Sequence, residues 1–244
     1  MKTYTRTLLL FLLSAAAIFP VSAQWRFGIQ GGYTYSTLTT KTRYFYDWNY
    51  VGRGGYAIGF PVQYEFFDWL AVQAELSWIQ KNYRLERSPY YGFYENRTNY
   101  YLSVPVFARF SFGGRKIRGF LNAGGYAGGW LASQRQGIEF TQFGTNQGAG
   151  TGSAYYQYDE NYEFDKRRDN RFEGGLLLGI GIEYRIENQM SVYIEGRYYH
   201  SLSDMQKKYM KDQAPRYLGT FLIQAGYILS LPLSPRPQAG KARL

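Results

Sequence analysis

The strongest constraint on the fold is a period-two alternation of apolar and polar residues that recurs along the chain. In residues 56–66 every second side chain, from Tyr56 to Phe66, is apolar or aromatic, and the residues between them are small or polar. The same alternation is clear in 70–78, 101–112, 176–185 and 192–199, and weaker in 26–36 and 219–230. A glycine-rich segment, 118–132, supplies an eighth strand whose faces the pattern does not assign. The pattern therefore predicts an all-β protein, and the mean hydropathy of −0.41 excludes a helical membrane protein of many spans.

The polar face of these strands carries full charges, which favours a membrane barrel over a soluble sandwich. A sandwich would place that face in water, whereas an eight-stranded transmembrane barrel turns its apolar side chains to lipid and its charges into a narrow lumen. The charged residues on the inward face are Glu65, Glu75, Arg109, Glu183, Arg185, Glu195 and Arg197. An unpaired buried charge is prohibitive, so we expect them to form an ion network that plugs the barrel. The alternative, a gated polar pore, needs more free bore than eight strands leave.

The connections between strands alternate strictly in length. Short turns are predicted near 67–69, 113–117 and 186–189. Long connections are predicted at 37–54, 83–98, 133–171 and 201–217. Aromatic residues gather at the strand ends, as in the girdles at membrane interfaces. The rhythm predicts an antiparallel transmembrane β-barrel with short periplasmic turns and long extracellular loops.

Two prolines inside predicted strands, Pro61 and Pro105, count against a closed sheet because each removes a backbone donor from the ladder. Both fall on the inward face by parity. A bulge or a lumen side chain would then satisfy the freed backbone group.

The N-terminus reads as an export signal. Lys2 and Arg6 precede an apolar stretch, and Val21 and Ala23 occupy the two small positions of a cleavage site. We therefore predict a signal peptide at 1–23, a barrel at 24–232 and a short basic periplasmic tail at 233–244. The expected location is the outer membrane of a Gram-negative cell, which excludes nucleic acid as a partner. With no cysteine, the chain has no disulfide and no thiolate metal site.

Three short motifs resemble a known family. Tyr101–Val106 reads Y-L-S-V-P-V, Gly179–Tyr184 reads G-I-G-I-E-Y, and Glu195–Tyr198 reads E-G-R-Y. These segments are similar to the fourth, sixth and seventh strands of the PorT-like small barrels of Bacteroidetes bacteria. The resemblance implies an eight-stranded outer-membrane barrel. It also implies an accessory role in the type IX protein secretion system, with other outer-membrane secretion proteins as partners.

The long connections are crowded with aromatic residues interleaved with arginine, a composition typical of interface hot spots. The candidate contact residues are Tyr44, Tyr46, Trp48, Tyr90, Tyr91, Tyr94, Tyr155, Tyr156, Tyr158 and Tyr162. They either bind a partner or pack against one another and cap the barrel. An adhesin that binds a ligand through these loops is the alternative function. The excess of 28 basic over 18 acidic residues also suits contact with the phosphates of outer-leaflet lipid A.

His200 is the one histidine of the chain and the centre of the one catalytic hypothesis. It lies beside Ser201 and near Asp204, so a rim enzyme with a catalytic triad, acting on lipid or protein, is a third candidate function. No second histidine and no G-x-S-x-G motif supports it. We therefore predict a non-enzymatic protein without catalytic residues, metal or cofactor, in which His200 is a polar residue at the membrane interface.

Overall fold

The computed structural model describes most of the predicted barrel and neither of its flanking segments. The described residues are 24–40, 48–87, 92–140, 155–187, 189–208 and 213–231. The predicted signal peptide and the predicted basic tail lie outside them. Within the described ranges, no helix has the length and apolar character that would carry it across a membrane.

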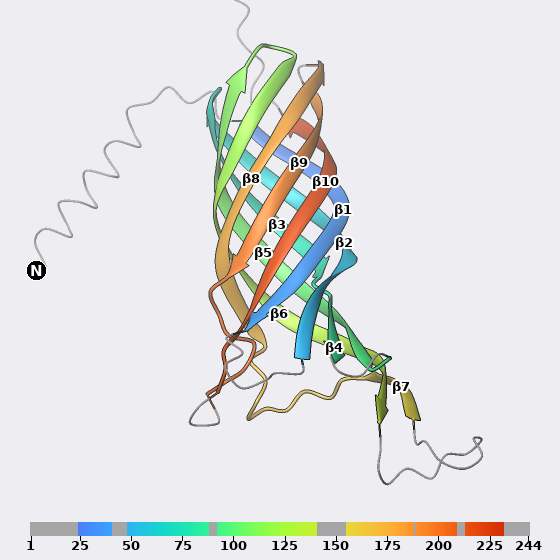
Figure 1. Ribbon diagram of the computed structural model, residues 1–244. Coiled ribbons are helices and arrows are strands. Elements are labelled where there is room, and N and C mark those ends of the chain that lie inside the picture. Colours follow the sequence, from blue (N-terminus) through green and yellow to red (C-terminus); the bar gives the residue numbers. More distant parts are fainter. Residues whose placement is uncertain are drawn as a thin grey trace, which may run out of the picture.

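Ten strands are described, and eight of them close a barrel (Figure 1). The strands are β1 (Gln24–Thr40), β2 (Trp48–Phe67), β3 (Leu70–Gln80), β4 (Tyr83–Arg87), β5 (Tyr94–Gly113), β6 (Ile117–Phe140), β7 (Tyr155–Asn161), β8 (Phe172–Glu187), β9 (Met190–Ser201) and β10 (Arg216–Leu231). The ring runs β1-β2-β3-β5-β6-β8-β9-β10 and returns to β1, and all of its pairs are antiparallel. The eight-stranded antiparallel fold class is therefore confirmed.

The strands extend further than the alternation predicts at the end that carries the long connections, which we call the outer end. β4 continues β3 after a break at Lys81 and Asn82, and β7 pairs with the last residues of β6. Much of the predicted connections 37–54, 83–98 and 133–171 is therefore strand. Beyond a membrane both faces of a sheet can meet water, so the ladder continues there without any contrast in polarity.

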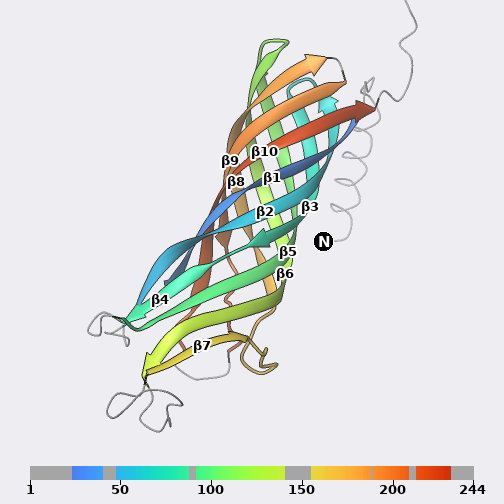
Figure 2. The same cartoon turned by 90° about the vertical axis from the view of Figure 1, so that its right-hand side faces the viewer.

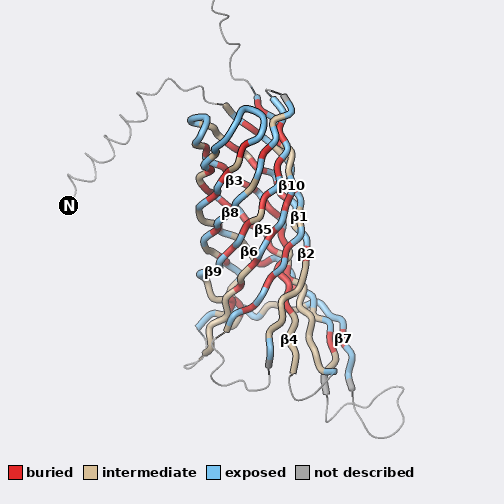
Figure 3. Tube along the Cα trace, turned by 45° about the horizontal axis from the view of Figure 1, so that its top comes forward, coloured by how far each residue is buried: buried red, intermediate tan, exposed pale blue. Residues whose placement is uncertain are grey.

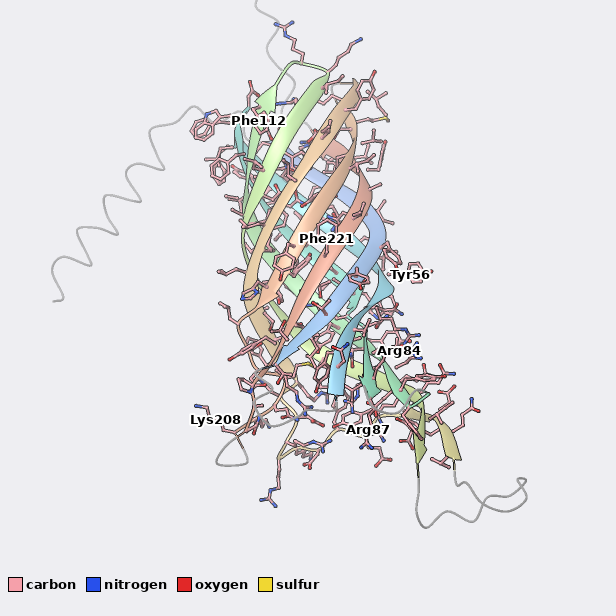
Figure 4. The ribbon with its side chains drawn as sticks, in the orientation of Figure 1. Tyr56, Arg84, Arg87, Phe112, Lys208 and Phe221 are labelled. Atoms are coloured by element: carbon pink, nitrogen blue, oxygen red, sulfur yellow. The ribbon has the colours of Figure 1, made fainter. Side chains whose placement is uncertain are left out.

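The two faces of the barrel wall are those that the alternation predicts. Leu178 and Ile180 are 65% and 62% exposed on the outside, whereas Leu177 between them is 1% exposed. Figure 3 shows the same alternation of buried and exposed positions along most strands. Phe112 projects outward near the end of the wall with the short turns, and Tyr56 projects outward further toward the other end (Figure 4). The outer face is therefore apolar, whereas the interior holds the charged and polar side chains together with buried apolar ones such as Leu177.

The glycine-rich strand that had no assigned faces is β6, and a bulge explains its weak pattern. Tyr100 pairs with Ala132 and Tyr101 with Trp130, which leaves Leu131 as an extra residue. Inward residues are therefore even-numbered up to Trp130, and the next buried one is Ser133. A bulge reverses the parity of a strand, and glycines remove the contrast in side-chain size that would reveal it.

Both prolines lie on the inward face, as predicted, and each faces an interruption in one ladder. The β1–β2 register passes from Phe27↔Val62 directly to Gln30↔Gly59, opposite Pro61. The β3–β5 register is likewise interrupted beside Pro105. On its other side each proline keeps its place in the ladder, Pro61 opposite Glu75 and Pro105 opposite Tyr126. Each proline therefore disturbs one of its two ladders.

The short turn from β5 to β6 provides a first prediction, because Gly113 has a φ of +120°. We expect Gly113→Ala to lower the free energy of unfolding by about 1–3 kcal/mol, since a side chain is strained in this backbone region. The control is Gly114→Ala, where an added Cβ would meet only the carbonyl of Ile117 at 3.7 Å. Denaturant unfolding in lipid vesicles measures both variants, and equal effects would contradict the prediction.

Candidate functional site

The seven charged residues predicted to face the lumen all lie in ion pairs there, and they form two layers. The layer nearer the short turns joins Arg26, Arg109 and Arg185 to Glu65 and Glu183. Arg26 Nη1 lies 2.7 Å from Glu65 Oε1, and Arg26 Nη2 lies 2.6 Å from Glu183 Oε1. Arg185 is 3.3 Å from Glu65 and 3.5 Å from Glu183, and Arg109 is 3.7 Å from Glu183. This layer connects β1, β2, β5 and β8.

The middle layer is centred on Arg197 of β9, whose side chain is completely buried. Its guanidinium contacts Glu75 at 2.7 and 2.8 Å and Glu195 at 2.7 and 2.9 Å. Amide groups complete the carboxylate shells: Gln30 and Gln73 donate to Glu75, and Asn122 and Gln224 donate to Glu195. Such hydrogen bonding is what makes buried ion pairs tolerable in a protein interior.

A third layer of buried charges, which was not among the predicted lumen residues, lies toward the outer end. Lys81 Nζ is 2.8 Å from both carboxylate oxygens of Glu173, and the ammonium lies 4.6 Å from the ring centre of Tyr126. Arg26 was missed as well. Extending the parity of each strand would have found all three residues, because Arg26, Lys81 and Glu173 continue the inward series of β1, β3 and β8.

Above these layers, part of the wall rises as a sheet that we call the outer sheet. It consists of residues 48–52 of β2, β4, residues 94–100 of β5, residues 131–140 of β6, and β7. Figure 2 shows these strands projecting to one side beyond the rest of the barrel. The remaining strands, β1, β3, β8, β9 and β10, are not part of this sheet. The outer end is therefore asymmetric.

A cavity of about 320 Å³ lies at the foot of the outer sheet. It is lined by Tyr50, Tyr83, Leu85, Glu95, Arg97, Trp130, Tyr162, Arg168, Asp169, Met205, Gln206 and Arg216. These residues come from the outer sheet, from Trp130 of β6 directly before it, from β10 and from the connections after β7 and β9. The cavity therefore combines aromatic rings with arginine and carboxylate groups at the mouth of the barrel.

Tyr162 organises one wall of this cavity. Its ring stacks on Trp130 with centroids 6.0 Å apart, and Arg97 lies 4.9 Å above the Tyr162 ring. Its hydroxyl donates to Asp169 at 2.8 Å and accepts a hydrogen bond from Arg168. Burial raises the pKa of Tyr162, so the phenol keeps its proton and remains a donor to Asp169. This wall is held by its own interactions without a ligand.

The ten aromatic residues predicted as loop contacts have different positions. Tyr158 is buried, and its hydroxyl donates to Glu95 at 3.0 Å, while Tyr156 is 57% exposed on β7. The ring of Tyr94 lies 4.3 Å from the guanidinium of Arg84. Trp48 and Tyr155 lie in strands, but their side chains are not among those described. The last four, Tyr44, Tyr46, Tyr90 and Tyr91, lie outside the described residues.

His200 and Ser201 do not form a catalytic pair. Consecutive residues of a strand point to opposite faces, and here His200 is exposed on the outer wall whereas Ser201 is buried. His200 stacks on Tyr198 at 6.3 Å, and the Ser201 hydroxyl donates to the carbonyl of Ser203 at 3.0 Å. Among the described residues there is also no cluster of three or more acidic or histidine side chains that could hold a metal.

The sequence relationship agrees with this architecture. Residues 17–207 match the sequence profile of a family described as outer membrane protein beta-barrel domain. The chain belongs to this family. It is an outer-membrane barrel, so its outer end faces the cell exterior and its short turns face the periplasm. Among proteins with curated functions, none matches its sequence.

Several solved structures are similar to this outer-membrane barrel. Neisserial surface protein A is 10% identical, with 84% of this chain and 97% of that chain covered and a TM-score of 0.43. OprG from Pseudomonas aeruginosa is 9% identical, with 84% and 95% covered and a TM-score of 0.45. Ail, the attachment invasion locus protein of Yersinia pestis, is 17% identical, with 84% and 99% covered and a TM-score of 0.40.

Proposed function

We propose that this outer-membrane barrel is a non-conducting, non-enzymatic accessory of protein secretion that binds a larger partner protein at its outer end. The observation that carries the proposal is the combination of a filled lumen with a structured outer sheet above it. The proposed system is type IX secretion, supported by the resemblance of three strand motifs to the PorT-like family. The proposed partners are larger outer-membrane secretion proteins and, at the membrane rim, the phosphates of lipid A.

The tightly filled lumen favours a role other than transport. Arg109 and Arg197 are completely buried, and Gln73, Glu75 and Glu195 are at most 2% exposed. Moving an ion along this path would require separating carboxylate and guanidinium groups that pair with one another inside the barrel. The barrel therefore acts as a membrane anchor for its outer end.

The outer sheet supports partner binding because it is already ordered. Its aromatic and arginine residues lie on paired strands, so little conformational entropy is lost when a partner binds. Tyr156, Arg84 and Arg87 are on this sheet, and Figure 4 shows the two arginines at the outer end of the protein. Tyrosine and arginine are the residue types that most often dominate binding energy in interfaces.

The test is a shortened outer sheet. Gln134 and Asn161 are cross-strand neighbours, so residues 135–160 can be replaced by an Asn-Gly turn that suits a two-residue hairpin. We expect the variant to insert normally, shown by heat-dependent migration on SDS gels. It should lose co-purification of outer-membrane partners in mild detergent, and export of secreted proteases should fall to the level of the deletion strain.

The control is His200→Ala, which changes the outer wall away from the outer sheet and is expected to leave export unchanged. Normal export in the deletion strain would refute the secretion role. Loss of export or an altered lipid profile in His200→Ala would favour the rim enzyme.

An adhesin is the second candidate, and the exposed Tyr156 on a sheet that faces the cell exterior favours it. For an adhesin, the shortened outer sheet would abolish attachment to surfaces while export of proteases stays normal.

A further inference from the structure

Both acidic groups of the cavity at the foot of the outer sheet already accept hydrogen bonds from the protein. Glu95 accepts hydrogen bonds from Arg97 and, at 3.0 Å, from the hydroxyl of Tyr158. Both oxygens of Asp169 accept from Tyr162, and Asp169 Oδ2 also accepts from the backbone N–H of Asp165 at 2.9 Å. Each carboxylate is thus already satisfied by the protein.

Two hydrogen-bond donors of residues that line the same cavity have no acceptor among the described residues. Trp130 is 2% exposed, and its indole Nε1–H has no hydrogen-bond partner among the described residues. Arg216 donates its backbone N–H to Asp204 at 3.0 Å, but its guanidinium has no ion pair or hydrogen bond within the described part of the chain. Leaving a buried donor unpaired is costly, so the lone indole N–H of a residue that lines the cavity needs an explanation.

The charge balance of the cavity also favours a ligand that accepts hydrogen bonds. Arg97 is balanced by Glu95, and Arg168 by Asp169, which lies 3.5 Å away. Arg216 is therefore the surplus cation. A ligand that fits should accept hydrogen bonds and carry negative charge, because the two carboxylates already accept from the protein and Arg216 supplies one positive charge that is not balanced.

We infer that this cavity binds a small ligand through an oxyanion, a carboxylate or a phosphate, which accepts from the Arg216 guanidinium and the Trp130 indole. The planar fork of arginine suits both kinds of oxyanion. Tyr50 and Tyr83, with ring centroids 6.2 Å apart, supply flat apolar surface for a ring on the ligand. The volume lies at the lower end of that of small-molecule sites. The inference goes beyond the proposed function, because it requires no protein partner.

The experiment is a calorimetric titration of the refolded mature barrel in a non-ionic detergent. The probes are benzoate, phenyl phosphate and inorganic phosphate, with benzamide as the neutral counterpart of benzoate. We expect at least one aromatic anion to bind saturably and roughly ten-fold or more tighter than benzamide, because charged hydrogen bonds are involved. The stronger of benzoate and phenyl phosphate identifies the oxyanion, and inorganic phosphate shows how much of the affinity the ring contributes.

Two variants test the named groups. Arg216→Gln should weaken anion binding about ten-fold or more and Trp130→Phe by a smaller factor, while Arg84→Gln should leave it unchanged. Arg84→Gln is the matched control, since it removes the same charge from a partly exposed arginine that does not line the cavity. Heat-dependent migration shows that each variant is folded.

Three outcomes would overturn the inference. They are no saturable binding of any anion, equal affinity for benzoate and benzamide, or equal effects of Arg216→Gln and Arg84→Gln. None of these outcomes bears on the proposed function, because capture of a protein partner by the outer sheet is measured separately.

Discussion

Arg197→Met is expected to lower the free energy of unfolding by about 3–5 kcal/mol, the cost of removing one partner from a buried ion pair. Arg197 is completely buried and makes two hydrogen bonds to each of Glu75 and Glu195. Methionine fills much of the same volume but leaves two carboxylates without their main cation. The measurement is equilibrium unfolding by guanidinium in lipid vesicles, followed by tryptophan fluorescence.

Two further variants make this prediction specific. Arg84→Met disrupts an ion pair whose side chains are 40% and 41% exposed, so its effect should stay within about 1 kcal/mol. Combining Arg197→Met with Glu75→Gln and Glu195→Gln should recover much of the lost stability, because no buried charge then remains unpaired. If Arg197→Met costs no more than Arg84→Met, the lumen network does not stabilise the barrel.

Ile180→Arg is expected to lower the free energy of unfolding by about 2–4 kcal/mol, the cost of arginine on the lipid face near the bilayer midplane. Ile180 lies midway along the outward series of β8, between Leu176 and Tyr184. The same substitution on the surface of a soluble protein would change stability by about 0.5 kcal/mol or less. The variant therefore tests directly whether this wall faces lipid.

The matched control is Ile186→Arg, on the same face of the same strand but beside the short periplasmic turn. Ile186 is 51% exposed, against 62% for Ile180, so the two positions differ mainly in depth. We expect about 0–1 kcal/mol for the control, because arginine near the interface reaches water. Equal penalties for the two variants in vesicles would contradict the assigned position of the membrane.

The sequence predicted the barrel well because a membrane barrel imposes one rule on every residue of a spanning strand. Ile180 and Arg197 could be assigned to opposite faces by parity alone. The same rule separates His200 from Ser201, since adjacent residues in a strand cannot share a face. Applied further along each strand, it also places Arg26, Lys81 and Glu173 in the lumen.

The candidate binding site was much harder to predict, since parity specifies a face and not a partner. Nothing in the sequence connects Arg26 to Glu183, 157 residues away, because that contact depends on the register of the closed ring. The bulge at Leu131 and the break between β3 and β4 also arise from how neighbouring strands align. Trp130 and Arg216 meet at one cavity only through this alignment.

The sequence by itself therefore determined the number of strands in the ring, the two faces of the wall and the membrane location, because lipid and lumen require different side chains at alternate residues. Only the tertiary structure decided which charges pair, how far the wall rises beyond the membrane and which side chains meet at its mouth. These depend on the closure of the ring, where residues that are distant along the chain come together across strands. Outside the membrane both faces can meet water, and the local pattern that specifies the barrel is lost.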